Sequence, residues 1–349
     1  MKRIWCALLL SALLVSCKLV QPVFNSRIDT AGGQVELSII GIDEDTGQLA
    51  TEVVEDDFNF LDQNWRVGGG GDLDLVNKLL PTGKAFAMPP SLLPLLGLGQ
   101  RFATSSGGLF DPAIGAILNL WGFSSPHVGN HPVPPATAIN ALLYRHPKIR
   151  DLDQDWILLR SNNPFVQLNF TGLLHGYGVD LAASRLQELG INNAIIEFGA
   201  AIRVIGDKDG QPWRIFIHRP EGGGIFAALD VKGDEGIVTL GNHERNFISK
   251  RKHYHEILDP RTGFPATGSR AVTVIHNNAV SADAAAYAIF VAGPELWTKV
   301  AATMGIELAA LLDAENVLHV TPAMHKRLIL MDKYMNIKVS DPIAVPDAE

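Results

Sequence analysis

Residues 108–123 read Gly-Leu-Phe-Asp-Pro-Ala-Ile-Gly-Ala-Ile-Leu-Asn-Leu-Trp-Gly-Phe, and this stretch decides the fold. Asp111 followed by Pro112 is a pattern that starts helices, because the carboxylate accepts backbone N–H groups and proline fits the first turn. Trp121 and Phe123 are expected in the core. Two roles stay open for Asp111, that of a helix cap and that of a carboxylate in a binding site.

Strand and helix patterns continue on both sides of this stretch. Val35–Ile40 alternates as a strand, and residues 177–189 have helical spacing that ends at Gly190. Short β patterns and two apolar helices follow without regular βαβ alternation, which predicts an α+β fold. The expected strands are 193–198, 213–218, 225–231, 236–239 and 271–275, and the expected helices are 282–291 and 294–304.

Composition limits the classes of protein that remain. The 349 residues include two cysteines, Cys6 and Cys17, and 47% hydrophobic residues, so a hydrophobic core without disulfides must stabilise the mature chain. The net charge is −8 and no basic block occurs. Because phosphate neutralisation requires clustered Lys and Arg, we expect no nucleic-acid partner.

The N-terminus has the pattern of an export signal. Lys2 and Arg3 precede an apolar run over residues 4–15, which is short for a transmembrane helix. Leu14-Val15-Ser16-Cys17 resembles the lipobox of bacterial lipoproteins, which implies lipidation of Cys17 and a membrane-anchored protein facing the periplasm. Ordinary secretion with cleavage nearby is the alternative. The predicted division is a signal peptide at 1–16, a linker at 17–34, one domain at 35–340 and a tail at 341–349.

Four further stretches join residues 108–123 in one resemblance. They are Leu-Asn-Phe-Thr-Gly-Leu-Leu-His-Gly-Tyr at 168–177, Glu-Phe-Gly-Ala-Ala-Ile-Arg at 197–203, Tyr-His-Glu-Ile-Leu-Asp-Pro-Arg-Thr-Gly-Phe-Pro at 254–265, and Ser-Ala-Asp-Ala-Ala-Ala-Tyr at 281–287. In this order they resemble the motifs of the ApbE family of FAD:protein FMN transferases. The resemblance implies a mixed, largely antiparallel sheet flanked by helices, with a flavin cleft between two lobes.

The resemblance also implies a reaction and its participants. FAD is cleaved at its pyrophosphate, and FMN is transferred to a threonine of an acceptor, usually a membrane redox protein. Phosphoryl transfer of this kind depends on positioning and on a cation, here Mg²⁺. Matching motif by motif places the metal at Gly172, Asp283 and Tyr287, with Asp283 also catalytic. It places FAD at Leu109, Phe110, Asp111, Asn169, His175 and Ile257.

Several matched positions depart from the family pattern. Asn169 replaces an Asp, His175 a Lys, Glu256 a His and Tyr287 a Thr, while Ala201 stands where a Glu is expected. Two hypotheses therefore remain, a working transferase and a catalytically degenerate lipoprotein that binds flavin or a partner. Asp283 likewise keeps an alternative role as a partner of a helix dipole.

Three other features carry weaker expectations. His253 and His255 lack a clear third ligand, so we interpret them as solvent-facing neighbours on a strand and not as a zinc site. Residues 68–71 are four glycines without the P-loop Lys, which indicates a connector. Trp65 and Arg66 could replace an aromatic residue that the family places against the flavin.

Overall fold

The computed structural model describes residues 21–125, 128–129, 131–220, 222 and 224–344. The predicted signal peptide, Cys17 and the last five residues of the predicted tail lie outside these ranges. Across the ranges that are described, no helix is both long enough and apolar enough to cross a membrane.

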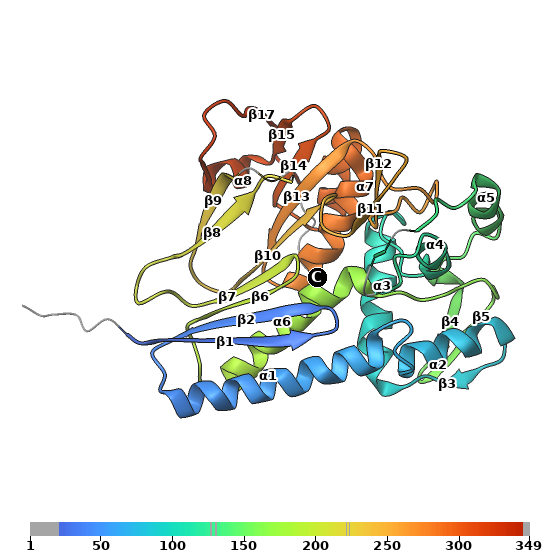
Figure 1. Ribbon diagram of the computed structural model, residues 1–349, viewed down its shortest axis with the longest axis horizontal. Helices are drawn as coiled ribbons and strands as arrows, with labels where there is room; N and C mark the ends of the chain where they lie inside the picture. The colour runs from blue at the N-terminus through green and yellow to red at the C-terminus, as the bar shows by residue number, and fades with distance from the viewer. Residues whose placement is uncertain (1–20, 126–127, 130, 221, 223, 345–349) are drawn as a thin grey trace, which may run out of the picture.

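A nine-stranded sheet forms the centre of the molecule, in the order β1-β2-β6-β7-β10-β13-β14-β15-β17 (Figure 1). Its neighbouring strands are antiparallel except β15 and β17, so the predicted mixed, largely antiparallel sheet is confirmed. The strands are β1 Val23–Thr30, β2 Gly33–Ile40, β6 Ala194–Phe198, β7 Ala201–Ile205, β10 Glu235–Gly241, β13 Ser269–His276, β14 Leu308–Asp313, β15 Val317–Val320 and β17 Asn336–Val339.

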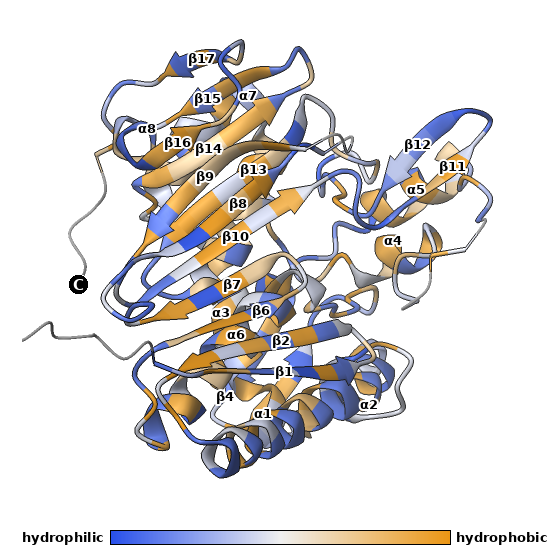
Figure 2. Cartoon of the chain, turned by 60° about the vertical axis from the view of Figure 1, so that its left-hand side comes forward, coloured by the Kyte–Doolittle hydropathy of each residue, from blue (hydrophilic) through white to orange (hydrophobic). Residues whose placement is uncertain are grey.

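The two faces of this sheet are covered by different partners. Ile39, Ile196 and Val238 belong to a core shared with helices, whereas Ile40 and Ile237 belong to a second core. Alternate residues of a strand point to opposite faces, so adjacent isoleucines enter separate cores. A three-stranded sheet, β16-β9-β8, covers the second face (Figure 2). Its strands are β8 Trp213–His218, β9 Ile225–Val231 and β16 Leu328–Leu330.

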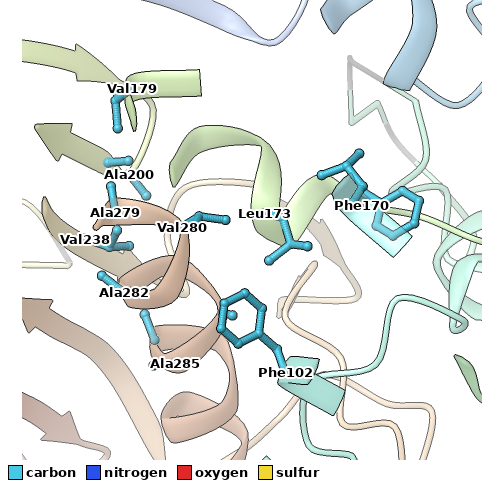
Figure 3. Packing of buried hydrophobic residues seen from close by; sticks show 14 of the residues in the cluster. Phe102, Phe170, Leu173, Val179, Ala200, Val238, Ala279, Val280, Ala282 and Ala285 are labelled. Atoms are coloured by element: carbon cyan, nitrogen blue, oxygen red, sulfur yellow. The ribbon is translucent and has the colours of Figure 1, made fainter. Parts of the chain in front are cut away.

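Helices α1, α6 and α7 cover the first face, and Figure 3 shows side chains of α6, α7 and β10 in their shared core. Asp43 starts α1 by accepting a hydrogen bond from the Thr46 amide at 2.9 Å. The long helices are α1 Glu44–Trp65, α3 Leu93–Ser105, α6 Thr171–Glu188 and α7 Ala279–Thr303. The shorter α2 Asp72–Leu79 follows the glycine connector, and α8 Pro322–Arg327 precedes β16.

A smaller lobe is built around α4 and α5 and carries the first motif (Figure 1). Its core joins Trp121 and Phe123 to Phe247 and Leu258 from the last third of the chain. Trp121 is fully buried, and its indole N–H donates to the Gly263 carbonyl at 2.8 Å. The lobe contains α4 Gly115–Leu120, α5 Ala136–Tyr144, β11 Asn246–Ser249 and β12 Lys252–His255. A third small sheet joins β3 Phe86–Ala87, β5 Leu158–Ser161 and β4 Leu152–Asp155.

Three predicted boundaries need correction. Residues 23–30 of the predicted linker form β1, because they pair over their full length with β2. Helix α6 begins at Thr171, six residues before the expected start, since Gly172 and Gly176 interrupt the apolar spacing. The first of the two apolar helices begins at Ala279 and not at residue 282, whereas the predicted break before Pro294 is confirmed, because α7 is kinked at Gly293, where φ is 68°.

Helices α6 and α7 are in direct backbone contact at Gly176. A Cβ atom there would lie 2.4 Å from the Ala279 carbonyl oxygen and 2.7 Å from the Val280 Cα. The Gly176 amide donates to Asp283 Oδ2 at 2.9 Å. Any side chain at this position would therefore separate the two helices.

We predict that Gly176→Ala destabilises the protein by about 1–3 kcal/mol through overpacking. Gly97→Ala is the matched control, because Gly97 is exposed on α3 and a Cβ there meets no atom within 4 Å. That control should be neutral or stabilising by roughly 0.5–1 kcal/mol. Urea unfolding measures both changes, and equal stability of the two variants would contradict the close-packing argument.

Candidate active site

A cavity of about 50 Å³ lies between the small lobe and helices α6 and α7. Ligand sites usually hold ~300 Å³ or more, so side chains fill most of this one. Six predicted site residues line the cavity, namely Leu109, Phe110, Asp111, Asn169, Gly172 and Tyr287. The sequence therefore identified residues that the fold brings together.

Asp111 holds two backbone segments beside the cavity. Its Oδ1 accepts hydrogen bonds from the Ala113 amide at 2.9 Å and from the Ile149 amide at 3.1 Å. Helix α4 begins only at Gly115 and has no side-chain cap. The helix-cap alternative is therefore wrong for α4, because the carboxylate connects the loop before it to residue 149. Burial raises the pKa of Asp111.

Gly172 and Asn169 shape the start of α6. Asn169 Oδ1 accepts a hydrogen bond from the Thr171 amide at 2.9 Å. A Cβ atom on Gly172 would lie 2.9 Å from the Phe110 ring and 3.2 Å from the Tyr287 ring. The two aromatic rings thus pack directly on the backbone of Gly172, which has no room for a side chain.

A second cavity of about 230 Å³ adjoins the first. Phe123 and Thr171 line both cavities, and His175 lines only the second. Burial lowers the pKa of His175 to about 4, so its imidazole is neutral near pH 7. Trp65 and Arg66 lie in the wall of this second cavity, which is compatible with the expectation that they replace an aromatic residue near the flavin.

Ile257 does not line either cavity. It is 1% exposed and belongs to the main core, whereas its neighbours Glu256 and Leu258 line the first cavity. Alternate side chains of an extended segment point in opposite directions, so only Ile257 turns inward. A contact between this side chain and a ligand is therefore not supported, although the segment itself borders the cavity.

Asp283 lies on α7, is completely buried and lines neither of the two cavities. Its Oδ2 accepts the Gly176 amide, while its Oδ1 is buried without a hydrogen-bond partner. Burial raises the pKa of Asp283 well above its usual value. A bound cation would favour the charged form of this carboxyl and lower its pKa. The unpartnered Oδ1 therefore fits the role of a Mg²⁺ ligand. Among the described residues, no group of three or more His, Cys, Asp or Glu side chains could hold a metal by itself.

Tyr287 follows Asp283 by one helical turn and faces the first cavity. Its ring is 6.3 Å from the Phe110 ring, centroid to centroid. Burial raises the pKa of the Tyr287 phenol well above 10, which disfavours the phenolate that binds metals best. The geometry brings Gly172, Asp283 and Tyr287 together on two helices, but the tyrosine fills space that a shorter hydroxyl side chain would leave open.

One charged pair escaped the sequence reasoning. Arg245 Nε lies 3.2 Å from Glu256 Oε2, and Glu256 lines the first cavity while Arg245 lines the second. Burial raises the pKa of Glu256 to about 7 against the opposing effect of Arg245. The sequence indicated Glu256 only as a departure from the family pattern. No local pattern indicated Arg245, because it precedes its partner by eleven positions.

The order of motifs around these cavities agrees with a family match. A model of the ApbE family matches residues 32–312. The chain belongs to the ApbE family. The FAD:protein FMN transferase of Rhodobacter capsulatus is 33% identical over 299 residues, which cover 85% of this chain and 57% of that protein. The FAD:protein FMN transferase of Vibrio cholerae is 31% identical over 213 residues, covering 60% of this chain and 63% of that protein.

Solved structures agree with the ApbE fold. The apo form of Pseudomonas stutzeri flavinyl transferase ApbE is 28% identical, with a TM-score of 0.77, and the match covers 88% of this chain and 97% of that one. The ApbE protein of Thermotoga maritima has a TM-score of 0.80 at 24% identity, with 88% and 99% covered, and shows the fold alone. The matches span about three fifths of the length of the two curated relatives named above.

The expectation that both histidines face solvent holds for His253 but is wrong for His255, which is buried on the same strand of this ApbE-family chain. His255 Nε2 lies 3.1 Å from the Ala266 carbonyl oxygen and donates to it when the neutral ring carries its proton on Nε2. Burial lowers the pKa of His255 to about 4. Since the folded state binds fewer protons than the unfolded state between pH 6.5 and 4, protonation opposes folding throughout this window.

We predict that the wild type loses about 2 kcal/mol more stability between pH 7 and pH 4.5 than His255→Gln does, because glutamine keeps an N–H donor but cannot be protonated. Urea unfolding at both pH values measures the difference. His253→Gln is the matched control and should follow the wild type. A parallel loss in His255→Gln and the wild type would show that His255 does not carry the effect.

Proposed function

We propose that this chain is an FAD:protein FMN transferase that moves FMN from FAD to a threonine hydroxyl of an acceptor protein. The observation that carries the proposal is the pair of adjoining cavities at the junction of α6, α7 and the small lobe. A dinucleotide has two halves joined by a pyrophosphate, and the two cavities share walls. The side chains that fill the first cavity would have to move for it to admit one of these halves. The curated relatives named above have this activity by name.

The binding roles follow from the walls of the cavities. Leu109, Phe110 and Asp111 offer an apolar wall and a fixed loop to the flavin ring, and Asn169 fixes the start of α6. Neutral His175 contributes hydrogen bonding to the second cavity without charge. Residues 256–258 contribute Glu256 and Leu258 in place of the expected Ile257.

We further propose Mg²⁺ as cofactor, held by the Asp283 carboxylate and the Gly172 carbonyl, with Tyr287 beside them as the third predicted ligand. The unpartnered Asp283 Oδ1 supports this assignment. When bound, the cation would neutralise the negative charge of the phosphates. Asp283 would thereby be ionised, and its charge at the base of the site helps to activate the acceptor hydroxyl.

The same proposal includes the location of the protein. Export as a lipoprotein anchored through Cys17 would place the cavities at a membrane surface facing the periplasm, where a membrane redox protein offers the acceptor threonine. The N-terminal pattern of residues 2–17 supports it. The acceptor is then reached in two dimensions, because enzyme and acceptor share one membrane.

A second candidate function rests on a specific observation. The Tyr287 ring packs on Gly172 and leaves only about 50 Å³ in the first cavity, which favours a degenerate lipoprotein that binds flavin or a partner without transferring FMN. The two candidates differ in whether a covalent bond to the acceptor forms.

Incubation of the chain from Lys18 onward with FAD, Mg²⁺ and a threonine-bearing acceptor domain tests the transferase. We predict that mass spectrometry finds the acceptor heavier by one FMN, only when Mg²⁺ is present and not after EDTA treatment. An acceptor whose threonine is replaced by alanine is the control. FAD binding without any mass increase would support the degenerate alternative and contradict the transferase.

The double change Tyr287→Thr with His175→Lys tests how far the substitutions limit the site. Threonine removes the ring from Gly172, and lysine brings a cation to the second cavity, so we predict tighter FAD binding by about tenfold or more. Fluorescence quenching of FAD on titration with protein measures this affinity. Tyr334→Thr, at a tyrosine that is 96% exposed, controls for the loss of a ring elsewhere. Unchanged affinity in the double variant would contradict the argument that these two side chains restrict the cavities.

A further inference from the structure

The ion pair of Arg245 and Glu256 lies where the two cavities meet. Glu256 borders the first cavity and Arg245 the second, and Phe123 and Thr171 border both. The Arg245 Nε and Glu256 Oε2 atoms are 3.2 Å apart. A ligand that fills both cavities must pass this pair, and in a dinucleotide the part between the two halves is the pyrophosphate.

Arg245 is fixed independently of Glu256. Its Nη2 donates to the Phe123 carbonyl at 2.9 Å and to the Ser125 carbonyl at 2.7 Å. Two main-chain acceptors on one guanidinium nitrogen hold the head group against the end of the first motif. The guanidinium therefore stays in place when its carboxylate partner is removed, which is what a preformed anion site requires.

Three residues in the wall of the second cavity have a buried polar atom that makes no hydrogen bond. Arg66 Nε, Ser124 Oγ and Arg245 Nε are all buried and make no hydrogen bond, and all three residues line this cavity. Asp62 is also in the wall, but its Oδ2 accepts the Ala31 amide at 2.6 Å. Buried donors of this kind favour an anionic ligand with several acceptor oxygens, as a phosphate has.

Glu256 is a weak partner for the cation it faces. Its side chain is 11% exposed, so both charges have lost most of their hydration. Within such a pair the desolvation cost largely offsets the attraction. The single contact at 3.2 Å does not meet hydrogen-bond geometry at Arg245 Nε. A phosphate that offers Arg245 better geometry would therefore displace Glu256 at little cost.

We propose that Arg245 exchanges partners when ligand binds, from Glu256 to a phosphoryl group of the dinucleotide. Arg245 is then a positioning residue, and Glu256 is its counter-ion in the empty site and a competitor of the ligand. This inference rests on the proposed function, since it takes FAD as the ligand. It assigns opposite effects to the two members of one ion pair.

Binding of FAD and of riboflavin to the full chain in EDTA, measured by fluorescence quenching, tests the exchange. Arg245→Gln should weaken FAD binding about tenfold or more, because a charge-assisted bond to phosphate is lost. Riboflavin, which has no phosphate, should bind within twofold of the wild type. Glu256→Gln should tighten FAD binding several-fold, since the competing carboxylate is gone. Glu315→Gln, at an exposed glutamate that lines neither cavity, is the control for a change of charge alone and should stay within twofold.

The opposite signs make the proposal falsifiable. If both variants weaken FAD binding, the pair is a structural contact and the exchange is wrong. If Arg245→Gln weakens the binding of riboflavin as much as the binding of FAD, the assignment of Arg245 to a phosphoryl group is wrong. If Arg245→Gln does not fold, Glu256→Gln decides alone: tighter FAD binding supports the exchange, and weaker FAD binding contradicts it. A wild type that binds FAD but does not transfer FMN contradicts the transferase and leaves the exchange testable, so the two failures are distinguishable.

Discussion

The contact between α6 and the first turns of α7 determines the arrangement of the site. Gly176 lets the two backbones meet, and its amide donates to Asp283 Oδ2. One helical turn later, Asp180 accepts the amides of Ala279 and Val280 at 2.9 Å each, so α6 adds to the capping of α7 by Asn278. Because both helices are fixed through these bonds, the Tyr287 ring on α7 is held against Gly172 on α6 in the wall of one small cavity.

This arrangement makes the site electrostatically costly. Asp283 is completely buried with one oxygen unmatched, and Asp180 depends on Arg203, whose Nε is 3.2 Å from Asp180 Oδ1. Groups of this kind are stable only when a partner satisfies them. Arg203 provides that partner for Asp180 from within the sheet, whereas Asp283 Oδ1 has none within the protein. Asp283 lies one helical turn before Tyr287, which lines the first cavity, and its unpartnered oxygen supports the cation proposed above.

The substitutions in the cleft have left the scaffold intact. Asp111 still connects two loops, and Asn169 still fixes the start of α6 with its side-chain oxygen, so the loss of a negative charge there costs no main-chain bond. Tyr287 and neutral His175 change what the cavities can hold, because one adds a ring and the other removes a cation. Asp111 and Asn169 both hold the backbone and line the first cavity, and the change at Asn169 keeps the side-chain oxygen that this backbone contact needs.

The sequence alone determined the strands whose apolar residues alternate, the family motifs and part of the wall of the first cavity, because these depend on local spacing and on residue order. Residues 225–231 were predicted to the residue. It did not determine that residues 23–30 complete the sheet, that Ile257 turns inward between Glu256 and Leu258, or that Arg245 faces Glu256 across the cavities. Those features depend on pairing between distant segments, on the direction of single side chains and on burial, and only the folded chain sets them.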